Sequence, residues 1–210
     1  FSGQFIAEGH LQNKSKFKSL GKVVFRREPF ALKITFIDSV FRSTIAEFLH
    51  AGEQIKIYMP VEKKVFIDTP DTIRLKNYTG IDLEYGFLCA LATGMVPLIE
   101  NYSIKQGLAR QHEKSEKKEL FAILDNGALF ETISFIDDIP RKIMLIRQSD
   151  KEKMEFYLDS PQYSGGGAFY RKVRFLSAKT GDRVSLSFRG IDFTKTPPPG
   201  SFDMKIPKNI

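Results

Sequence analysis

Apolar and polar residues alternate position by position through most of this chain. In Ile55-Lys56-Ile57-Tyr58-Met59 and in Met154-Glu155-Phe156-Tyr157-Leu158, every second side chain is apolar. A period of two residues is typical of a half-buried antiparallel strand, which has one face in the core and one in water. The pattern predicts strands at 4–12, 20–27, 30–37, 44–50, 53–59 and 63–68, and then at 102–109, 118–125, 128–136, 140–148, 152–159, 169–176 and 182–193.

The connections between these stretches are short and rich in turn-forming residues. Ala51-Gly52, Asp125-Asn126-Gly127, Asp137-Asp138 and Thr180-Gly181-Asp182 are typical of tight hairpins. Consecutive strands should therefore pair as an antiparallel meander. A chain of 210 residues suffices for one sizeable all-β domain but not for two, so we expect a single domain over residues 1–210.

One segment between the two groups of strands has the pattern of a helix. Thr79 and Asp82 stand at the spacing of a capping box, and Gly94 with Pro97 marks the end. The segment is apolar nearly all round, so both of its sides should be covered. One side can lie on the sheet, and the other needs a helix, a lid element or a ligand. A sheet this apolar on one side must also close on itself, meet a second sheet or hold an apolar ligand.

The charge of the chain is compatible with a membrane surface more than with nucleic acid. The formal net charge is +7, but Lys33, Lys56 and Arg174 stand between apolar neighbours on predicted strands. Basic groups placed in this way spread over the outside of a sheet, so we expect no nucleic-acid partner. Attraction to an anionic membrane fits the same charge, at about 1 kcal/mol for each basic group close to the lipid.

Residues that could carry out catalysis are scattered. His10, His50 and His112 have no second ligand at metal-binding spacing, so each is expected to have a structural or surface role. Neither a nucleophile elbow nor a phosphate-binding glycine loop is present, and carboxylates such as Asp137 stand in turns. The lone Cys89 is flanked by apolar residues, as a core thiol would be. We expect a protein that is not an enzyme and has no metal and no cofactor.

An apolar pair stands where a soluble hairpin would normally be polar. In Asp38-Ser39-Val40-Phe41-Arg42-Ser43, turn residues flank Val40 and Phe41. One interpretation is that the strands are longer and Phe41 returns to the core. The other is an exposed tip that contacts a membrane or a partner, with Arg42 near lipid headgroups.

The order of these features resembles the LolA/LolB lipoprotein-localisation superfamily of bacterial envelopes, and is closer to its LolB-like acceptors. The resemblance covers most of the chain. It rests on the following features: Gly21-Lys22-Val23-Val24-Phe25-Arg26-Arg27 before Pro29 and the strand from Phe30 to Phe36, Gly52 with Ile57-Tyr58-Met59-Pro60, the helix ending Gly94-x-x-Pro97, the Gly181 turn, and the ending from Ile191 through Phe202 to Pro207. Two departures are that Glu28 precedes Pro29, where LolA-like carriers have arginine, and that the family's N-terminal helix has no counterpart.

The resemblance implies a mainly β fold: an incomplete antiparallel β-barrel of about eleven strands, with a helical lid over a hydrophobic cavity. It also implies a periplasmic monomer that binds acyl chains of lipoproteins or phospholipids, meets an anionic membrane, and works with a periplasmic carrier or acceptor. Val40, Phe41 and Arg42 correspond to the protruding membrane-contacting loop of LolB-like acceptors. Anchoring to the outer membrane would require a lipidated N-terminus that lies outside this sequence.

Apolar positions of the predicted strands and helix are the candidates for the cavity wall. We expect the wall to include Phe30, Leu32, Ile34, Phe36, Ile55, Ile57, Leu88, Leu91, Met95, Ile133, Phe135, Phe156, Leu158, Leu186 and Phe188. The alternative is that the same side chains interdigitate as an ordinary dry core. Three functions fit the sequence: a lipoprotein carrier or outer-membrane acceptor, an envelope sensor or assembly module that binds a protein or signalling lipid, and a hydrolase acting on an amphiphile.

Overall fold

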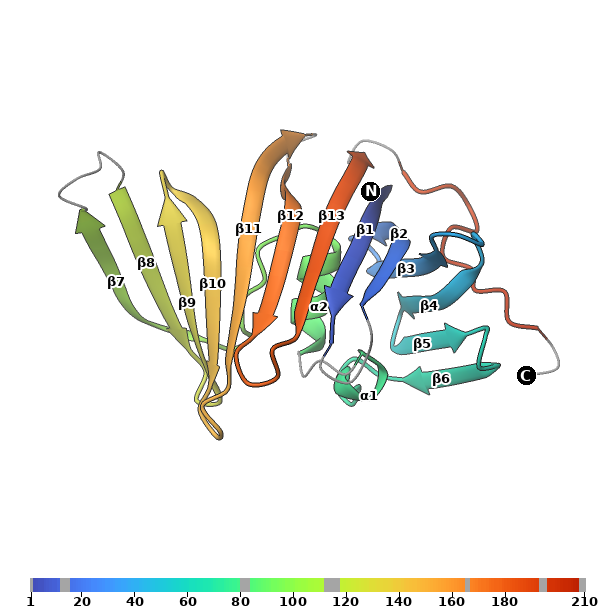
Figure 1. Cartoon of the computed structure of the whole chain (residues 1–210), viewed down its shortest axis with the longest axis horizontal. Helices are drawn as coiled ribbons and strands as arrows, with labels where there is room; N and C mark the ends of the chain where they lie inside the picture. The colour runs from blue at the N-terminus through green and yellow to red at the C-terminus, as the bar shows by residue number, and fades with distance from the viewer. Residues whose placement is uncertain are drawn as a thin grey trace.

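The computed structural model describes residues 2–11, 16–79, 84–111, 118–164, 167–192 and 196–207, and their main feature is one large antiparallel sheet (Figure 1). Its strands are β1 (Ser2–His10), β2 (Phe17–Arg26), β3 (Ala31–Asp38), β4 (Thr44–Ala51), β5 (Gln54–Met59), β6 (Lys64–Asp68), β7 (Ser103–Gln111), β8 (Lys118–Asp125), β9 (Leu129–Ile136), β10 (Ile139–Arg147), β11 (Lys153–Ser164), β12 (Gly167–Ser177) and β13 (Arg183–Asp192). The helices are α1 (Lys76–Thr79) and α2 (Tyr85–Ala92).

The sheet is an open, strongly twisted half-barrel. The strand order is β6-β5-β4-β3-β2-β1-β13-β12-β11-β10-β9-β8-β7, and its two edge strands, β6 and β7, are not paired with each other. The prediction of an incomplete antiparallel barrel is therefore confirmed. The thirteen strands of the described residues match those predicted from the alternation, whereas the resemblance implied about eleven.

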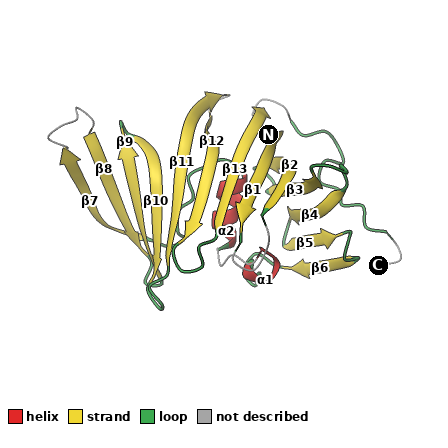
Figure 2. Cartoon of the chain, viewed as in Figure 1, coloured by secondary structure: helices red, strands yellow, loops and turns green. Residues whose placement is uncertain are grey.

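The alternation of side chains gives the sheet two chemically distinct faces. On β11, Met154, Phe156 and Leu158 are buried on the face against which α2 packs, while Glu155 and Tyr157 belong to the opposite face. We call these the inner face and the outer face. Figure 2 shows how much of the molecule the strands form, with α2 behind the middle of the sheet and α1 next to the tip of β6.

The chain passes from one edge of the sheet to the other between β6 and β7, and this crossing connection carries both helices. The prediction of a helix capped by Thr79 is wrong, since Thr79 ends α1 and α2 begins at Tyr85. Asp82, the other half of the expected capping box, lies outside the described residues. The predicted end is confirmed: Gly94 follows α2 with φ +69°, a left-handed conformation that favours glycine.

The core lies between α2 and the inner face. The ring centroid of Phe87 on α2 is 5.3 Å from that of Phe156, which is 5.2 Å from that of Phe175. Near the centre of the sheet, a Cβ at Gly21 would lie 2.1 Å from the ring of Phe5, so only glycine leaves room for that ring. α2 and the sheet therefore meet through a closely packed aromatic layer.

The outer face carries paired charges and, over β3 to β5, the C-terminal segment 196–207. The Lys33 ammonium donates to the carbonyl of Asp203, and the guanidinium of Arg26 lies 4.9 Å from the ring centroid of Phe202. Leu49 and Tyr58 are buried on this part of the outer face. The C-terminal segment thus lies over the part of the outer face where these two apolar side chains are buried.

Candidate functional site

Most side chains predicted for the cavity wall come together on the inner face. The buried ones are Leu32, Ile34, Ile55, Ile57, Leu91, Ile133, Phe156, Leu158 and Phe188. Phe36, Leu88, Phe135 and Leu186 are partly buried and pack against the same cluster, whereas Phe30 and Met95 are more exposed. Because these side chains pack on one another in one buried cluster, they are core residues in this structure, and contact with a lipid stays a prediction.

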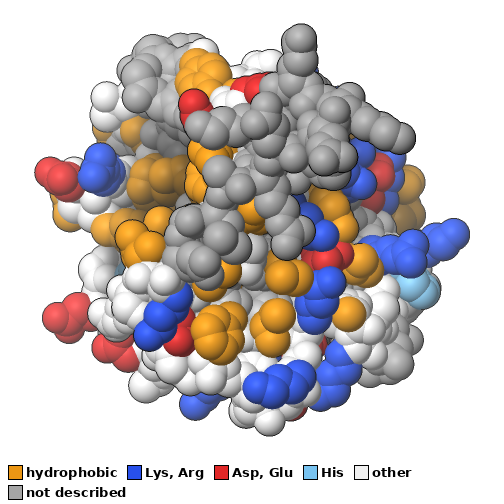
Figure 3. Space-filling model, turned by 90° about the vertical axis from the view of Figure 1, so that its left-hand side faces the viewer, with side chains coloured by type: hydrophobic (Ala, Val, Ile, Leu, Met, Phe, Trp, Pro, Cys, Tyr) orange, Lys and Arg blue, Asp and Glu red, His pale blue; other side chains and the backbone are white. Residues whose placement is uncertain are grey.

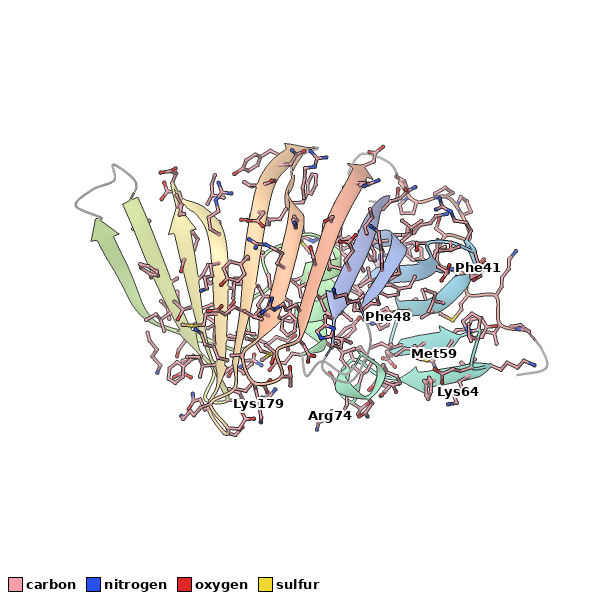
Figure 4. The ribbon with its side chains drawn as sticks, viewed as in Figure 1. Phe41, Phe48, Met59, Lys64, Arg74 and Lys179 are labelled. Carbon is pink, nitrogen blue, oxygen red and sulfur yellow. The ribbon has the colours of Figure 1, made fainter. Side chains whose placement is uncertain are left out.

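A cavity lies beside this cluster, at the end of the half-barrel where the β8–β9 and β10–β11 turns meet the crossing connection. It has a volume of about 1080 Å³. Its apolar floor consists of Ile73, Leu75, Phe87, Leu129, Leu145 and Met154. Its polar lining includes Asp71, Arg74, Glu84, Glu100, Asn126, Arg147 and Gln148. Figure 4 shows Arg74 at the lower edge of the molecule, on the same side as Lys179 of the β12–β13 turn.

None of the residues predicted for the wall lines this cavity. Leu129 and Met154 lie on the inner face of strands that carry predicted wall residues, closer to the hairpin turns. Each lies an even number of positions from a predicted wall residue on its strand, so the alternation of the sequence could have placed it on the same face. Ile73 and Glu84 come from the crossing connection. The alternation that predicts strands does not predict the path of this connection over the sheet.

Hydrogen bonds between the hairpin turns fix one wall of the cavity. The backbone N–H of Gln148 donates to the carbonyl of Ala128 at 2.9 Å, and the Gln148 side-chain amide donates to Asp125 at 3.1 Å. The Asn126 side-chain amide donates to the Glu100 carbonyl at 3.1 Å, which ties the β8–β9 turn to the crossing connection. These hydrogen bonds hold the polar wall of the cavity in place, and none of them involves the apolar side chains of the floor.

Carboxylates gather on the α2 side of the cavity. Burial raises the pKa of Glu84, and the nearby charge of Glu100 raises it further. Deeper on the inner face, Glu131 of β9 is fully buried, and burial raises its pKa to about 7, against the opposing effect of a hydrogen bond from the Ile99 N–H. Glu131 was not predicted from the sequence, because a glutamate between Phe130 and Thr132 on a strand is expected to face solvent.

A histidine holds α2 to the other half of the sheet. His50 on β4 is buried, and its Nε2–H donates to the carbonyl of Gly52 at 2.9 Å. Its Nδ1 therefore accepts a hydrogen bond from the hydroxyl of Tyr85 at the start of α2. Burial lowers the pKa of His50, which favours this neutral tautomer. The structural role expected for His50 is what these contacts describe.

The β3–β4 turn presents its apolar pair to solvent. Phe41 is 84% exposed, so the interpretation in which it returns to the core is wrong. Asp38 Oδ1 accepts the backbone N–H groups of Val40 and Phe41 at 2.8 and 2.7 Å, and Arg42 has φ +59°. These bonds lower the pKa of Asp38 and set the tip in one conformation. Membrane contact by Val40, Phe41 and Arg42 stays a prediction.

A second exposed apolar residue stands at the same end of the sheet. Val61, in the turn between β5 and β6, is 80% exposed. Because β3 and β5 run in the same direction with β4 between them, their turns are about 10 Å apart at the usual strand spacing. In Figure 4, Phe41 and Lys64 both lie on the right-hand side of the molecule, with Lys64 beside β6.

Within the described part of the chain, no group of three or more histidine, cysteine or acidic residues could hold a metal ion. Likewise, no described helix is long and apolar enough to cross a membrane. Burial raises the pKa of Cys89 to about 11, which makes it a poor nucleophile. Where Figure 3 shows side chains in colour, Lys and Arg are interspersed with acidic and apolar groups rather than gathered in one patch.

Solved structures share this fold. A LolA superfamily protein from Nitrosomonas europaea superposes with a TM-score of 0.66 at 9% sequence identity, covering 97% of this chain and 90% of that one. A domain named for outer membrane lipoprotein sorting, from Vibrio parahaemolyticus, gives 0.63 at 14% identity, over 96% and 89%. A DUF1329 family protein from Desulfovibrio piger gives 0.67 at 9% identity, over 96% and 88%. No family model and no curated protein matches the chain. The chain has a LolA/LolB-like fold.

Proposed function

We propose that this protein is a non-enzymatic, periplasmic carrier or acceptor that holds acyl chains of lipoproteins or phospholipids in the half-barrel and passes them to the outer membrane. The observation that carries the proposal is the cavity of about 1080 Å³, with its apolar floor, beside the buried inner face. Its volume is slightly above the range of about 300–1,000 Å³ that is typical of ligand pockets. One neighbour named for outer membrane lipoprotein sorting supports the same class of ligand.

The arrangement of the cavity suits an amphiphile. Leu129, Leu145 and Met154 offer an apolar floor, and Arg74 and Arg147 stand in the lining beside acidic and amide groups. An acyl chain against the floor would gain about 0.8 kcal/mol for each methylene removed from water. The polar lining would leave the headgroup solvated. Entry of a longer chain onto the covered wall would require α2 to move away from Phe156.

The exposed tips would supply the membrane contact. Val40 and Phe41 on the β3–β4 turn and Val61 on the β5–β6 turn can insert among lipid headgroups, with Arg42 and Lys63 beside them as cations. Side chains this exposed contribute little to the stability of the fold, which leaves them available to a partner surface. This combination of an exposed apolar tip and a lipid cavity favours a LolB-like acceptor.

Displacement of a fluorescent fatty acid tests the cavity. Ile73 is buried in the cavity floor, whereas Ile67 on edge strand β6 is 64% exposed. Ile73→Glu should weaken probe binding at least tenfold, since a carboxylate would replace apolar lining, whereas Ile67→Glu should bind as the wild type does. Circular dichroism checks that both variants are folded. Normal binding by a folded Ile73→Glu variant would exclude this cavity as the acyl-chain site.

A further inference from the structure

Glu131 is the most unusual polar residue of the inner face. It is 0% exposed and lies on β9 between Leu129 and Ile133, which are buried on the same side. In the register of the sheet it stands opposite Leu124 of β8 and Leu145 of β10. Its Oε2 accepts the backbone N–H of Ile99 at 3.0 Å, whereas its Oε1 has no hydrogen-bond partner among the residues that the structure describes. A buried carboxyl group with one free oxygen is costly unless the structure uses it.

The partner of Glu131 belongs to the segment that leads from α2 to β7. This segment is attached to the sheet at three points in the described structure. The Gly94 carbonyl accepts the Tyr170 N–H at 3.0 Å, the Glu100 carbonyl accepts the Asn126 side chain at 3.1 Å, and the Ile99 N–H donates to Glu131. Only the third attachment uses an ionisable group. The Ile99 N–H bond by itself favours the carboxylate, but burial has the larger effect on the Glu131 pKa and favours the neutral form, so protonation stabilises this attachment as a whole.

The charged groups around Glu131 disfavour its ionised form. Glu84 at the start of α2 raises the pKa of Glu131, and Glu100 directly follows Ile99 in the crossing connection. The neighbouring strands present leucines, and no ion pair joins Glu131 to any described residue. Burial is the largest cause that raises the pKa of this carboxyl group, to about 7. Its protonation state is therefore poised to change near neutral pH.

We infer that Glu131 is a proton-operated latch, which holds segment 94–101 against the sheet when protonated and loosens it when ionised. The neutral carboxyl group keeps the Ile99 N–H bonded within an apolar surrounding. The carboxylate would need water or further donors, and the cavity bordered by Leu129, Leu145 and Glu84 is the space from which water can enter. Ionisation should therefore open the cover of the inner face at its Ile99 attachment.

Hydrogen exchange of segment 94–101 tests the latch without any lipid. After correction for the intrinsic rate, protection in the wild type should fall about tenfold between about pH 6 and pH 8, because the open form ionises with an ordinary glutamate pKa. Peptides from β3 should not show this fall if the opening is local. Glu131→Gln, which can still accept the Ile99 N–H, should keep high protection at both pH values.

Two further variants keep this test decisive. Glu155→Gln on the outer face should leave the fall unchanged, since ion pairs lower the pKa of Glu155 to about 2. Glu131→Leu, which removes the charge without an amide, should also abolish the fall if Glu131→Gln does not fold. A flat wild-type profile, or the same fall in the Glu131 variants, would overturn the latch.

The consequence for ligand release rests on the proposed function and is measured separately. Dissociation of the fluorescent fatty acid should be faster at about pH 8 than at about pH 6 in the wild type, and equal at both in Glu131→Gln. If exchange shows the fall but no probe binds, the latch stands and the proposed function fails. If the probe binds and exchange is flat, the proposed function stands and the latch fails.

Discussion

Two glutamates of the same sheet show how different its two faces are. Glu131 on the inner face has one backbone hydrogen bond, and its pKa is raised to about 7. Glu155 on the outer face is 9% exposed, yet it bonds Lys142, Lys153 and the hydroxyl of Tyr157, and its pKa is lowered to about 2. Burial alone does not set the charge of a carboxyl group; the available donors do. The outer face provides three donors to Glu155, whereas one backbone N–H donates to Glu131 on the inner face.

The largest difference between the faces should appear in neighbouring aromatic residues. Phe156 is fully buried between Phe87 and Phe175, so Phe156→Ala should lower the free energy of unfolding by about 3–5 kcal/mol. Tyr157, next in sequence, lies on the outer face between the cations of Lys142 and Arg174, and Tyr157→Ala should cost about 1 kcal/mol. Urea denaturation measures both. Equal losses would mean that the inner face is not a packed core.

Much of this contrast could be predicted from the sequence. The alternation along β11 assigns Phe156 and Leu158 to one side and Tyr157 to the other, because strand geometry couples parity to side. Gly94 marked the end of α2 because few other residues adopt its left-handed φ. The start of α2 was missed, since Thr79 fits a capping box but belongs to the end of a separate helix, α1.

Tertiary contacts account for the rest of what was missed. Glu131 has the sequence context of a solvent-facing strand residue, and only the crossing connection brings Ile99 over it. The cavity likewise combines Ile73 and Glu84 with two hairpin turns that are distant in sequence. Contacts of this kind depend on the path of the segment between β6 and β7. Hydrophobic periodicity describes elements and not the paths between them.

A smaller difference between the two faces is expected in how their glutamates make the stability of the fold depend on pH. The pKa of Glu131 is higher in the folded protein than the ordinary value of 4.5, so stability should fall as pH rises from about 4.5 to about 7. Glu131→Gln should remove this loss and gain about 3 kcal/mol at about pH 8. Glu155 has a lowered pKa, so its contribution is present above about 4.5 and is lost as pH falls toward about 2.

Denaturation curves measured across both pH ranges test the stability changes expected from Glu131 and from Glu155 together. Glu131→Gln should change the slope only on the neutral side, and Glu155→Gln only on the acid side. If Glu131→Gln were less stable than the wild type at about pH 8, an ionised Glu131 would have to be stabilised by donors that the fold does not present. The contrast between the faces would then lose its electrostatic basis.

The smallest effect on stability is expected at the β3–β4 tip, whose apolar side chains pack on neither face. Phe41→Ser should change the free energy of unfolding by less than about 0.5 kcal/mol, because the ring is 84% exposed. Binding to anionic phospholipid vesicles should nevertheless weaken about tenfold or more, since inserting a phenylalanine is worth about 1.5–3 kcal/mol. Ile67→Ser, on edge strand β6, is the matched exposed control and should bind vesicles normally.

Vesicle sedimentation at two salt concentrations separates the apolar and charged parts of this contact. The contribution of Arg42 and Lys63 should decrease with salt because the charges are screened, whereas that of Phe41 should persist. If Phe41→Ser and Ile67→Ser bound vesicles equally well, the tip would have no special affinity for lipid. Exposure of Phe41 would then have to serve contact with a protein, and the alternative of an assembly module would account better for a turn whose apolar tip Asp38 holds outward.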